Sequence, residues 1–237
     1  MIPLRDENPS GSAPAVTITL ITLNVLVFVY EVLQGPALHS FIMSWGFVPA
    51  RFTSSLQGGA EPLLMPALTL FSSMFLHGGW GHLLGNMWFL WIFGDNIEDR
   101  FGKLGYLLFY LAAGVAAVLV HYALGTRSAV PTVGASGAIA GVLGAYLVAY
   151  PKARVVTLIP LIFIMHMVAL PAVVLLGLWF LFQFLSQAAA ASMSAAGGGV
   201  AYAAHIGGFV FGVVTMLLLR GRTAPREPRP PRAVRFS

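Results

Sequence analysis

Two residues of this chain, each set among small residues, have the side chains needed for nucleophilic catalysis. Ser136 lies in residues 134–138, which read GASGA, and His205 lies in residues 204–208, which read AHIGG. A histidine within hydrogen-bond reach of a serine can take the hydroxyl proton and later deliver it to a leaving amine. The pair therefore predicts acyl transfer through a serine nucleophile, provided that the fold brings the two residues together.

A second pair, His82 and Asn86, could stabilise the negative charge that such a reaction develops. The two residues are four positions apart, so they share one face of a helix and can donate hydrogen bonds toward a single point. Donors aimed at a tetrahedral oxyanion make a large contribution to catalysis. The alternative is that both are structural residues that bond neighbouring helices.

Each candidate also has a structural interpretation. Ser136 could be a helix cap or a small packing residue, and His205 could be a structural histidine. The Gly-x-Ser-x-Gly elbow of α/β-hydrolases is matched only at its first Gly and its Ser, and no sheet is predicted to carry it. His77 and His82 are five apart and no acidic residue joins them, so we predict neither a metal site nor a cofactor. The chain has no cysteine, which excludes a thiol nucleophile.

The composition is that of a membrane protein. Of the residues, 58% are hydrophobic and only 9% are charged, whereas soluble domains carry about 25% charged residues. The apolar residues come in blocks of roughly 20, the length of a helix that crosses a bilayer. We therefore predict an all-α, polytopic membrane protein with one membrane domain. The net charge of +5 comes mostly from a short C-terminal tail, so membrane topology explains it better than nucleic-acid binding.

Hydropathy predicts six membrane-spanning helices in a membrane domain of residues 16–220. Residues 1–15 are expected to form a flexible cytoplasmic tail, and residues 221–237, rich in Arg and Pro, a disordered one. The six spans are expected at residues 16–33, 81–94, 104–124, 136–150, 170–187 and 201–219.

Three segments next to or between the spans are predicted to differ in structure. The charged cluster of residues 95–100 is expected to end the second span. Pro160 and Pro171 interrupt a long apolar run, so residues 155–168 are predicted to form a re-entrant or interfacial segment. Residues 188–199 are mostly Ala, Ser and Gly and are predicted to be a flexible loop. This loop either lets the fifth span move to admit a substrate or is simply an unstructured connector.

The basic residues orient the bundle. An even number of spans puts both termini on one side, and an N-in, C-in arrangement places 11 of the 13 Lys and Arg residues inside. In that orientation Ser136 begins its span at the outer side, and His205 lies one turn into a span that also begins there. His82 and Asn86 then lie in the outer half of theirs, so the four candidates share one depth. The other polar residues expected at membrane depth are His77 and Gln183.

Glycine spacing predicts how the nucleophile and the base meet. Gly208 and Gly212 form a small-xxx-small pair, which predicts close packing of the last span on the equally glycine-rich fourth span. That contact would put His205 beside Ser136. No acidic residue is obviously placed behind His205, so we predict a Ser–His dyad whose imidazole is oriented by packing. The fourth span is about 15 residues, or about 22 Å, so Ser136 starts below the outer surface.

These motifs together resemble the rhomboid family of intramembrane serine proteases over about residues 16–220. Gly-x-Ser-Gly around Ser136 is similar to the family's nucleophile motif, and AHIGG around His205 is similar to the motif of its base. His82-x-x-x-Asn86 is similar to its oxyanion pair, and residues 96–102 resemble its turn after the second span.

The resemblance implies cleavage of single-span membrane proteins at or just below the outer surface. Ser136 would attack the carbonyl and His205 would act as base and then acid. The Ser136 N–H, His82 and Asn86 would bind the oxyanion, and membrane lipid would surround the protein. Some members place an aromatic residue four positions after the serine, against the catalytic histidine. Here that residue is Ala140, so Tyr202 or Phe209 is expected to support the imidazole.

Two other functions, an inactive client-binding protein and a transporter, fit the sequence less well. A catalytically inactive rhomboid-like protein that binds transmembrane clients would be expected to lack Ser136 or His205, and both are present. A small transporter would be expected to show internal repeats, and none is found. We expect a multi-pass protein of the cell membrane, in particular a bacterial plasma membrane.

Overall fold

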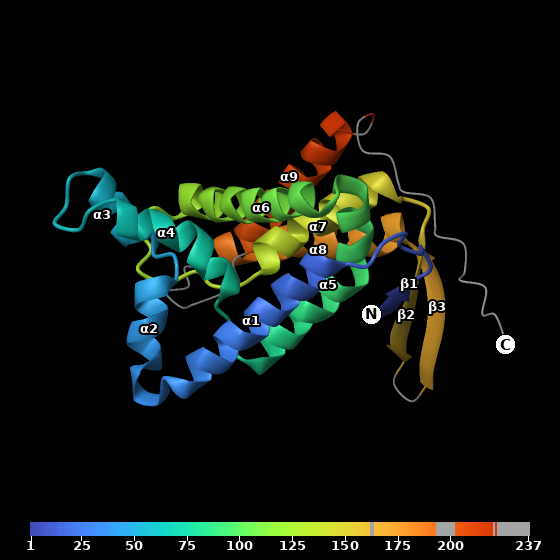
Figure 1. Ribbon diagram of the computed structural model, residues 1–237, viewed down its shortest axis with the longest axis horizontal. Helices are drawn as coiled ribbons and strands as arrows, with labels where there is room; N and C mark the ends of the chain where they lie inside the picture. Colours follow the sequence, from blue (N-terminus) through green and yellow to red (C-terminus); the bar gives the residue numbers. More distant parts are fainter. Residues whose placement is uncertain (162–163, 193–201, 220, 222–237) are drawn as a thin grey trace, which may run out of the picture.

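A computed structural model describes residues 1–161, 164–192, 202–219 and 221, and it is mostly helical (Figure 1). Its longer helices are α1 (Ala15–Leu33), α5 (Trp80–Phe101), α6 (Lys103–Leu124), α7 (Ser136–Ala149), α8 (Ala172–Ser192) and α9 (Tyr202–Leu219). The shorter ones are η1 (Gly35–Ala37), α2 (Leu38–Trp45), α3 (Pro49–Leu56), α4 (Leu64–Ser72) and η2 (Ser73–Phe75). The strands are β1 (Ile2–Asp6), β2 (Arg154–Leu161) and β3 (Ile164–Pro171).

The helices have the character of a membrane bundle. Three of them, α1, α6 and α9, are long and apolar enough to cross a bilayer, judged by length and composition within the described residues. Shorter apolar helices cover Leu64–Phe75, Ser136–Ala149 and Ala172–Leu185. A helix lies at each of the six positions where the sequence predicts a span, and the mixed region between α1 and α5 is broken into short helices.

Helix α5 is longer than predicted, because the charged cluster of residues 95–100 continues it instead of ending it. The carboxylate of Glu98 accepts hydrogen bonds from the N–H groups of Val16 at 3.0 Å and Thr17 at 2.8 Å. These N–H groups belong to the first turn of α1 and have no partner within that helix. Asp99 accepts hydrogen bonds from Ser12 in the same way. The carboxylates of Glu98 and Asp99 can therefore be buried within the length of α5, since the N-terminal segment supplies their hydrogen-bond donors.

A small antiparallel sheet corrects the all-α prediction. Strand β2 pairs with β1 on one side and β3 on the other, at one end of the bundle (Figure 1). Residues 2–6 of the predicted flexible tail therefore form a strand, and the predicted re-entrant or interfacial segment of residues 155–168 forms most of β2 and β3. Val155 and Thr157 are fully buried and alternate with less buried neighbours, as in a strand with one covered face.

The N-terminal strand is fastened to the helices. The indole N–H of Trp88 in α5 donates a 2.6 Å hydrogen bond to the carbonyl of Pro3. The hydroxyl of Tyr146 in α7 donates a 2.6 Å hydrogen bond to Asp6. Burial raises the pKa of the Asp6 carboxyl to about 6, although the bond from Tyr146 acts in the opposite direction. Sheet and bundle therefore share polar contacts at this end of the molecule.

Two predicted segments lie wholly or partly outside the described residues. The flexible loop was expected over residues 188–199, but α8 continues to Ser192, which corrects the expected start of the loop. Alanine has the highest helix propensity, so the Ala run favours the helix. Residues 193–199 of the predicted loop and 222–237 of the predicted disordered tail lie outside the described residues.

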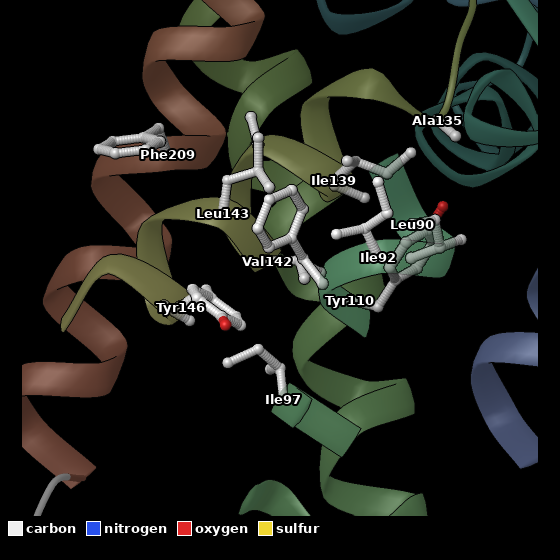
Figure 2. Packing of buried hydrophobic residues seen from close by; sticks show 14 of the residues in the cluster. Leu90, Ile92, Ile97, Tyr110, Ala135, Ile139, Val142, Leu143, Tyr146 and Phe209 are labelled. Carbon is white, nitrogen blue, oxygen red and sulfur yellow. The ribbon is translucent and has the colours of Figure 1, made fainter. Parts of the chain in front are cut away.

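Helix α7 is the centre of the bundle. It packs against α5, α6, α8 and α9, and its residues from Gly137 to Tyr146 are all buried. Figure 2 shows its side chains between Phe209 of α9 and the apolar side chains of α5. The residue that begins α7 is therefore held from several sides at once.

The packing of α7 on α9 depends on glycine, as the sequence predicts. A Cβ atom added at Gly208 would lie 2.0 Å from the carbonyl oxygen of Gly137. One added at Gly212 would lie 1.9 Å from the carbonyl oxygen of Gly141. The two backbones thus approach as closely as the absence of side chains allows. This contact fixes the start of α9 against the start of α7.

Candidate active site

The structure brings Ser136 and His205 together at the adjoining ends of α7 and α9. Ser136 is the first residue of α7, and His205 lies in the first turn of α9. The two atoms Ser136 Oγ and His205 Nε2 are 2.7 Å apart, which is a hydrogen bond of ordinary length. Both side chains are partly buried. At this distance the imidazole can accept the hydroxyl proton of Ser136.

Gln183 of α8 stands behind the imidazole. Its Oε1 lies 2.8 Å from His205 Nδ1. An amide oxygen only accepts hydrogen bonds, so Nδ1 carries the proton and donates it. Nε2 is then free to accept the hydroxyl proton of Ser136. The imidazole is therefore oriented by an amide hydrogen bond, whereas the sequence had suggested packing alone.

Aromatic rings complete the support of His205. The ring centroid of Trp179 lies 6.0 Å from that of the imidazole, and Tyr202 meets it edge-on at 6.4 Å. Tyr202 was one of the two residues expected here. Phe209, the other, packs on Trp179 at 6.0 Å between centroids. Ala140 has no ring, so the aromatic support comes from Trp179 of α8 and Tyr202 of α9.

The backbone before Ser136 passes directly over the ring of His82. A Cβ atom added at Gly134 would lie 2.8 Å from His82 Nε2, and the φ angle of Gly134 is 129°. Only glycine therefore fits both the conformation and the space. The Gly134 N–H is bonded to the carbonyl of Ser73 at 2.8 Å, which holds this loop in place. The ring nitrogen of His82 thus faces the segment that carries the nucleophile.

The sequence predicts three donors for an oxyanion near Ser136. The N–H of Ser136 is at the start of a helix, where N–H groups have no intrahelical partner. His82 Nδ1 accepts a 3.4 Å bond from the Gly78 N–H, so the proton of the ring is on Nε2. Asn86 follows one turn later and is 8% exposed, and its Nδ2 has no hydrogen-bond partner among the described residues. Buried donors are normally hydrogen-bonded, so this unpartnered amide group is available to bind a substrate oxygen.

The four candidates thus come from α5, α7 and α9, and they all fall in the region that the family comparison identifies. The Rhomboid domain family model matches residues 66–222, more than half of the chain.

The chain belongs to the rhomboid family.

Curated relatives of this rhomboid chain are longer proteins. It is 46% identical over 70 residues to Rhomboid-like protein 11, chloroplastic, of Arabidopsis thaliana, which covers 30% of this chain and 25% of the relative. It is 30% identical over 200 residues to Presenilin-associated rhomboid-like protein A, mitochondrial, of Danio rerio, which covers 82% and 45%. It is 35% identical over 136 residues to Rhomboid protease GluP of Bacillus subtilis, which covers 56% and 24%. The chain therefore spans less than half the length of each of these relatives.

The structure and the family support one part of the predicted location, the membrane. Its apolar helices and its family make it a membrane protein. Two of the three relatives carry the names of organelles, the chloroplast and the mitochondrion. The comparisons therefore do not support the expected bacterial plasma membrane.

Proposed function

We propose that this rhomboid protein is an intramembrane serine endopeptidase that cleaves single-span membrane proteins near the outer membrane surface. The observation that carries the proposal is the 2.7 Å approach of Ser136 Oγ to His205 Nε2, with Gln183 behind the imidazole. The relative whose printed name is Rhomboid protease GluP supports the same activity.

The proposed topology has six membrane crossings, by α1, α5, α6, α7, α8 and α9, with both termini inside. Its support is the distribution of Lys and Arg, 11 of 13 of which fall inside in this arrangement. Ser136, at the outer end of α7, then lies just below the outer surface. Substrate and water would both reach it from that side, with lipid around the remaining faces.

The proposed reaction proceeds through an acyl-enzyme. Ser136 Oγ attacks the scissile carbonyl carbon while its proton passes to His205 Nε2. The carbonyl oxygen becomes an oxyanion, for which the N–H of Ser136 and the side chains of His82 and Asn86 are the donors. The C–N bond then breaks as the imidazolium gives its proton to the leaving amine. Water, activated by the same imidazole, hydrolyses the ester and restores Ser136. The chemistry requires no cofactor.

Replacing Asn86 with alanine tests the oxyanion assignment. We expect kcat for cleavage to fall about 10- to 100-fold. This is less than the about 10²- to 10³-fold typical of an oxyanion donor, because the other two of the three donors remain. The KM should change little, because the donor acts mainly in the transition state. Asn24→Ala is a matched control, because Asn24 bonds within α1 to the carbonyl of Leu20 at 2.7 Å. An equal loss of kcat in both variants would contradict the assignment.

Replacing Gln183 with leucine tests the support of His205. The imidazole would lose the acceptor that fixes its tautomer and orientation, so kcat should fall about 10- to 100-fold. Gln183→Glu keeps an acceptor at this position and is expected to retain more activity than Gln183→Leu. Steady-state cleavage assays on both variants would measure the difference. Wild-type kcat in Gln183→Leu would mean that packing alone orients His205.

The rival function is a catalytically inactive rhomboid-like protein that binds transmembrane clients. A fluorophosphonate probe separates the two, because it phosphonylates only an activated serine. We expect wild-type protein in detergent to form one adduct, on the peptide that contains Ser136, as read by mass spectrometry. Absence of labelling in folded protein would favour the client-binding function.

A further inference from the structure

A buried carboxylate in α1 has no role in the reaction described so far. Glu31 is 1% exposed, although it belongs to an apolar helix that is long enough to cross the membrane. Acidic residues at such positions are costly and need specific partners. Both carboxylate oxygens of Glu31 accept from the backbone N–H of His77, at 3.2 and 3.1 Å.

The bond holds the turn that leads into α5. Residues 77–79 read His-Gly-Gly, and Gly79 has a φ angle of 155°, which favours glycine. The His77 ring is buried, and its nitrogens have no hydrogen-bond partner in the described part of the chain. Its centroid lies 5.1 Å from that of His82 and 6.4 Å from that of Phe28. Glu31 therefore fixes the backbone, and the imidazole of His77 serves as a packing surface for His82.

The same turn orients His82. The N–H of Gly78, the residue after the one held by Glu31, donates to His82 Nδ1 at 3.4 Å. This bond places the ring proton on Nε2. His82 Nε2 lies against Gly134. A Cβ atom added at Gly134 would be 2.8 Å from His82 Nε2 and 3.5 Å from Ser136 Oγ. One chain of contacts thus runs from Glu31 through residues 77–78 to the face of His82 that meets the nucleophile.

We propose that Glu31 is a positioning residue of the active site, which holds the His77–Gly78 backbone so that His82 presents its Nε2–H to the oxyanion. The inference rests on the proposed protease function. Glu31 touches neither the dyad nor a substrate in this scheme, and its effect passes entirely through His82.

The chain contains a matched control for this role. Glu98 is also 1% exposed and also accepts backbone N–H groups, those of Val16 and Thr17. It caps the opposite end of α1, away from the end where Glu31 meets the turn before α5. A loss of activity caused only by weaker packing of α1 should therefore appear in Glu98→Ala as well as in Glu31→Ala.

The test compares Glu31→Ala, Glu31→Gln and Glu98→Ala, each purified in detergent. We expect Glu31→Ala to lower kcat about 10- to 100-fold with KM within about twofold of wild type, since a displaced donor acts on the transition state. Glu31→Gln should recover most of kcat, because its amide oxygen still accepts from His77. Glu98→Ala should lower the unfolding temperature and leave kcat per folded molecule within about twofold.

A double-mutant cycle tests the route through His82. In a His82→Ala background, which keeps two of the three donors, Glu31→Ala should have no further effect on kcat beyond about twofold. An undiminished effect in that background would overturn the proposal, as would an equal loss of kcat in Glu98→Ala.

A spectroscopic readout is independent of catalysis. In ¹⁵N-histidine NMR spectra of wild-type protein, His82 should be the neutral tautomer with Nδ1 unprotonated, and Glu31→Ala should shift it toward a tautomer mixture. An unchanged His82 signal in Glu31→Ala would overturn the positioning role. If wild-type protein cleaves nothing and binds no fluorophosphonate, the protease function fails, whereas the NMR result still decides whether Glu31 orients His82.

Discussion

Ser136→Ala is expected to reduce cleavage of a single-span membrane substrate at least about 10⁴-fold, the scale on which serine proteases depend on their nucleophile. His205→Ala should reduce it to a similar extent, because a serine hydroxyl without its base is a weak nucleophile. The 2.7 Å bond between the two implies that they act as a unit. The double variant should therefore be no slower than either single variant. Cleavage is measured with detergent-solubilised enzyme and a tagged substrate.

Two substitutions of the same kind provide controls. Ser73→Ala removes a buried hydroxyl that has no hydrogen-bond partner among the described residues, although the Ser73 carbonyl binds the loop before Ser136. His166→Ala removes an exposed imidazole on β3. Both should keep near-wild-type cleavage. Cleavage by folded Ser136→Ala at the wild-type rate would contradict the assignment of the nucleophile.

The meeting of Ser136 and His205 could be inferred from the sequence because its causes are local and periodic. Glycines spaced four apart indicate a helix face without side chains, and both α7 and α9 carry such a face. Two faces of this kind allow the closest approach of the two backbones, so the helices are expected to pack on each other. That contact brings together two residues that are 69 positions apart in the sequence.

Gln183 was visible in the sequence but had no assigned partner. An amide inside an apolar helix is costly unless it is hydrogen-bonded, which singles the residue out. Which group it meets depends on how α8 is rotated against α9, and α8 has little amphipathic pattern to define that rotation. No carboxylate is placed behind His205 in the sequence pattern, and the amide oxygen of Gln183 serves as the acceptor instead.

The sheet could not be predicted, because nothing local defines it. The run that forms β2 and β3 is apolar on both faces, so it lacks the alternation of a half-buried strand. Its pairing with β1 joins segments about 150 residues apart, as in the register Ile2 opposite Leu158. In the sequence alone, the polar residues 1–15 resemble a tail. Their position depends on hydrogen bonds to an acceptor on α5 and from the hydroxyl of Tyr146, both of which are far away in the sequence.

Gly212→Ala is expected to destabilise the protein by about 3 kcal/mol, the upper part of the usual range for overpacking. The added Cβ would lie 1.9 Å from the carbonyl oxygen and 2.7 Å from the carbonyl carbon of Gly141. Both atoms belong to the backbone, so no side chain can rotate away and α9 must move off α7. His205 moves with α9, and a displacement of about 1 Å can cost about 100-fold in rate. Fluorophosphonate labelling of Ser136 should slow at least to that extent.

Gly177→Ala is the matched control, since it makes the same change in α8 at a glycine whose added Cβ would meet nothing within 4 Å. Alanine in place of a helical glycine stabilises by up to about 1 kcal/mol, so this variant should unfold at the wild-type temperature or slightly above it. Its labelling rate should match that of wild type. If both variants unfold and label alike, then the approach of α9 to α7 is not what holds His205 against Ser136. A selective loss in Gly212→Ala, with both its stability and its labelling rate reduced, would mean that the glycine contact holds the dyad together.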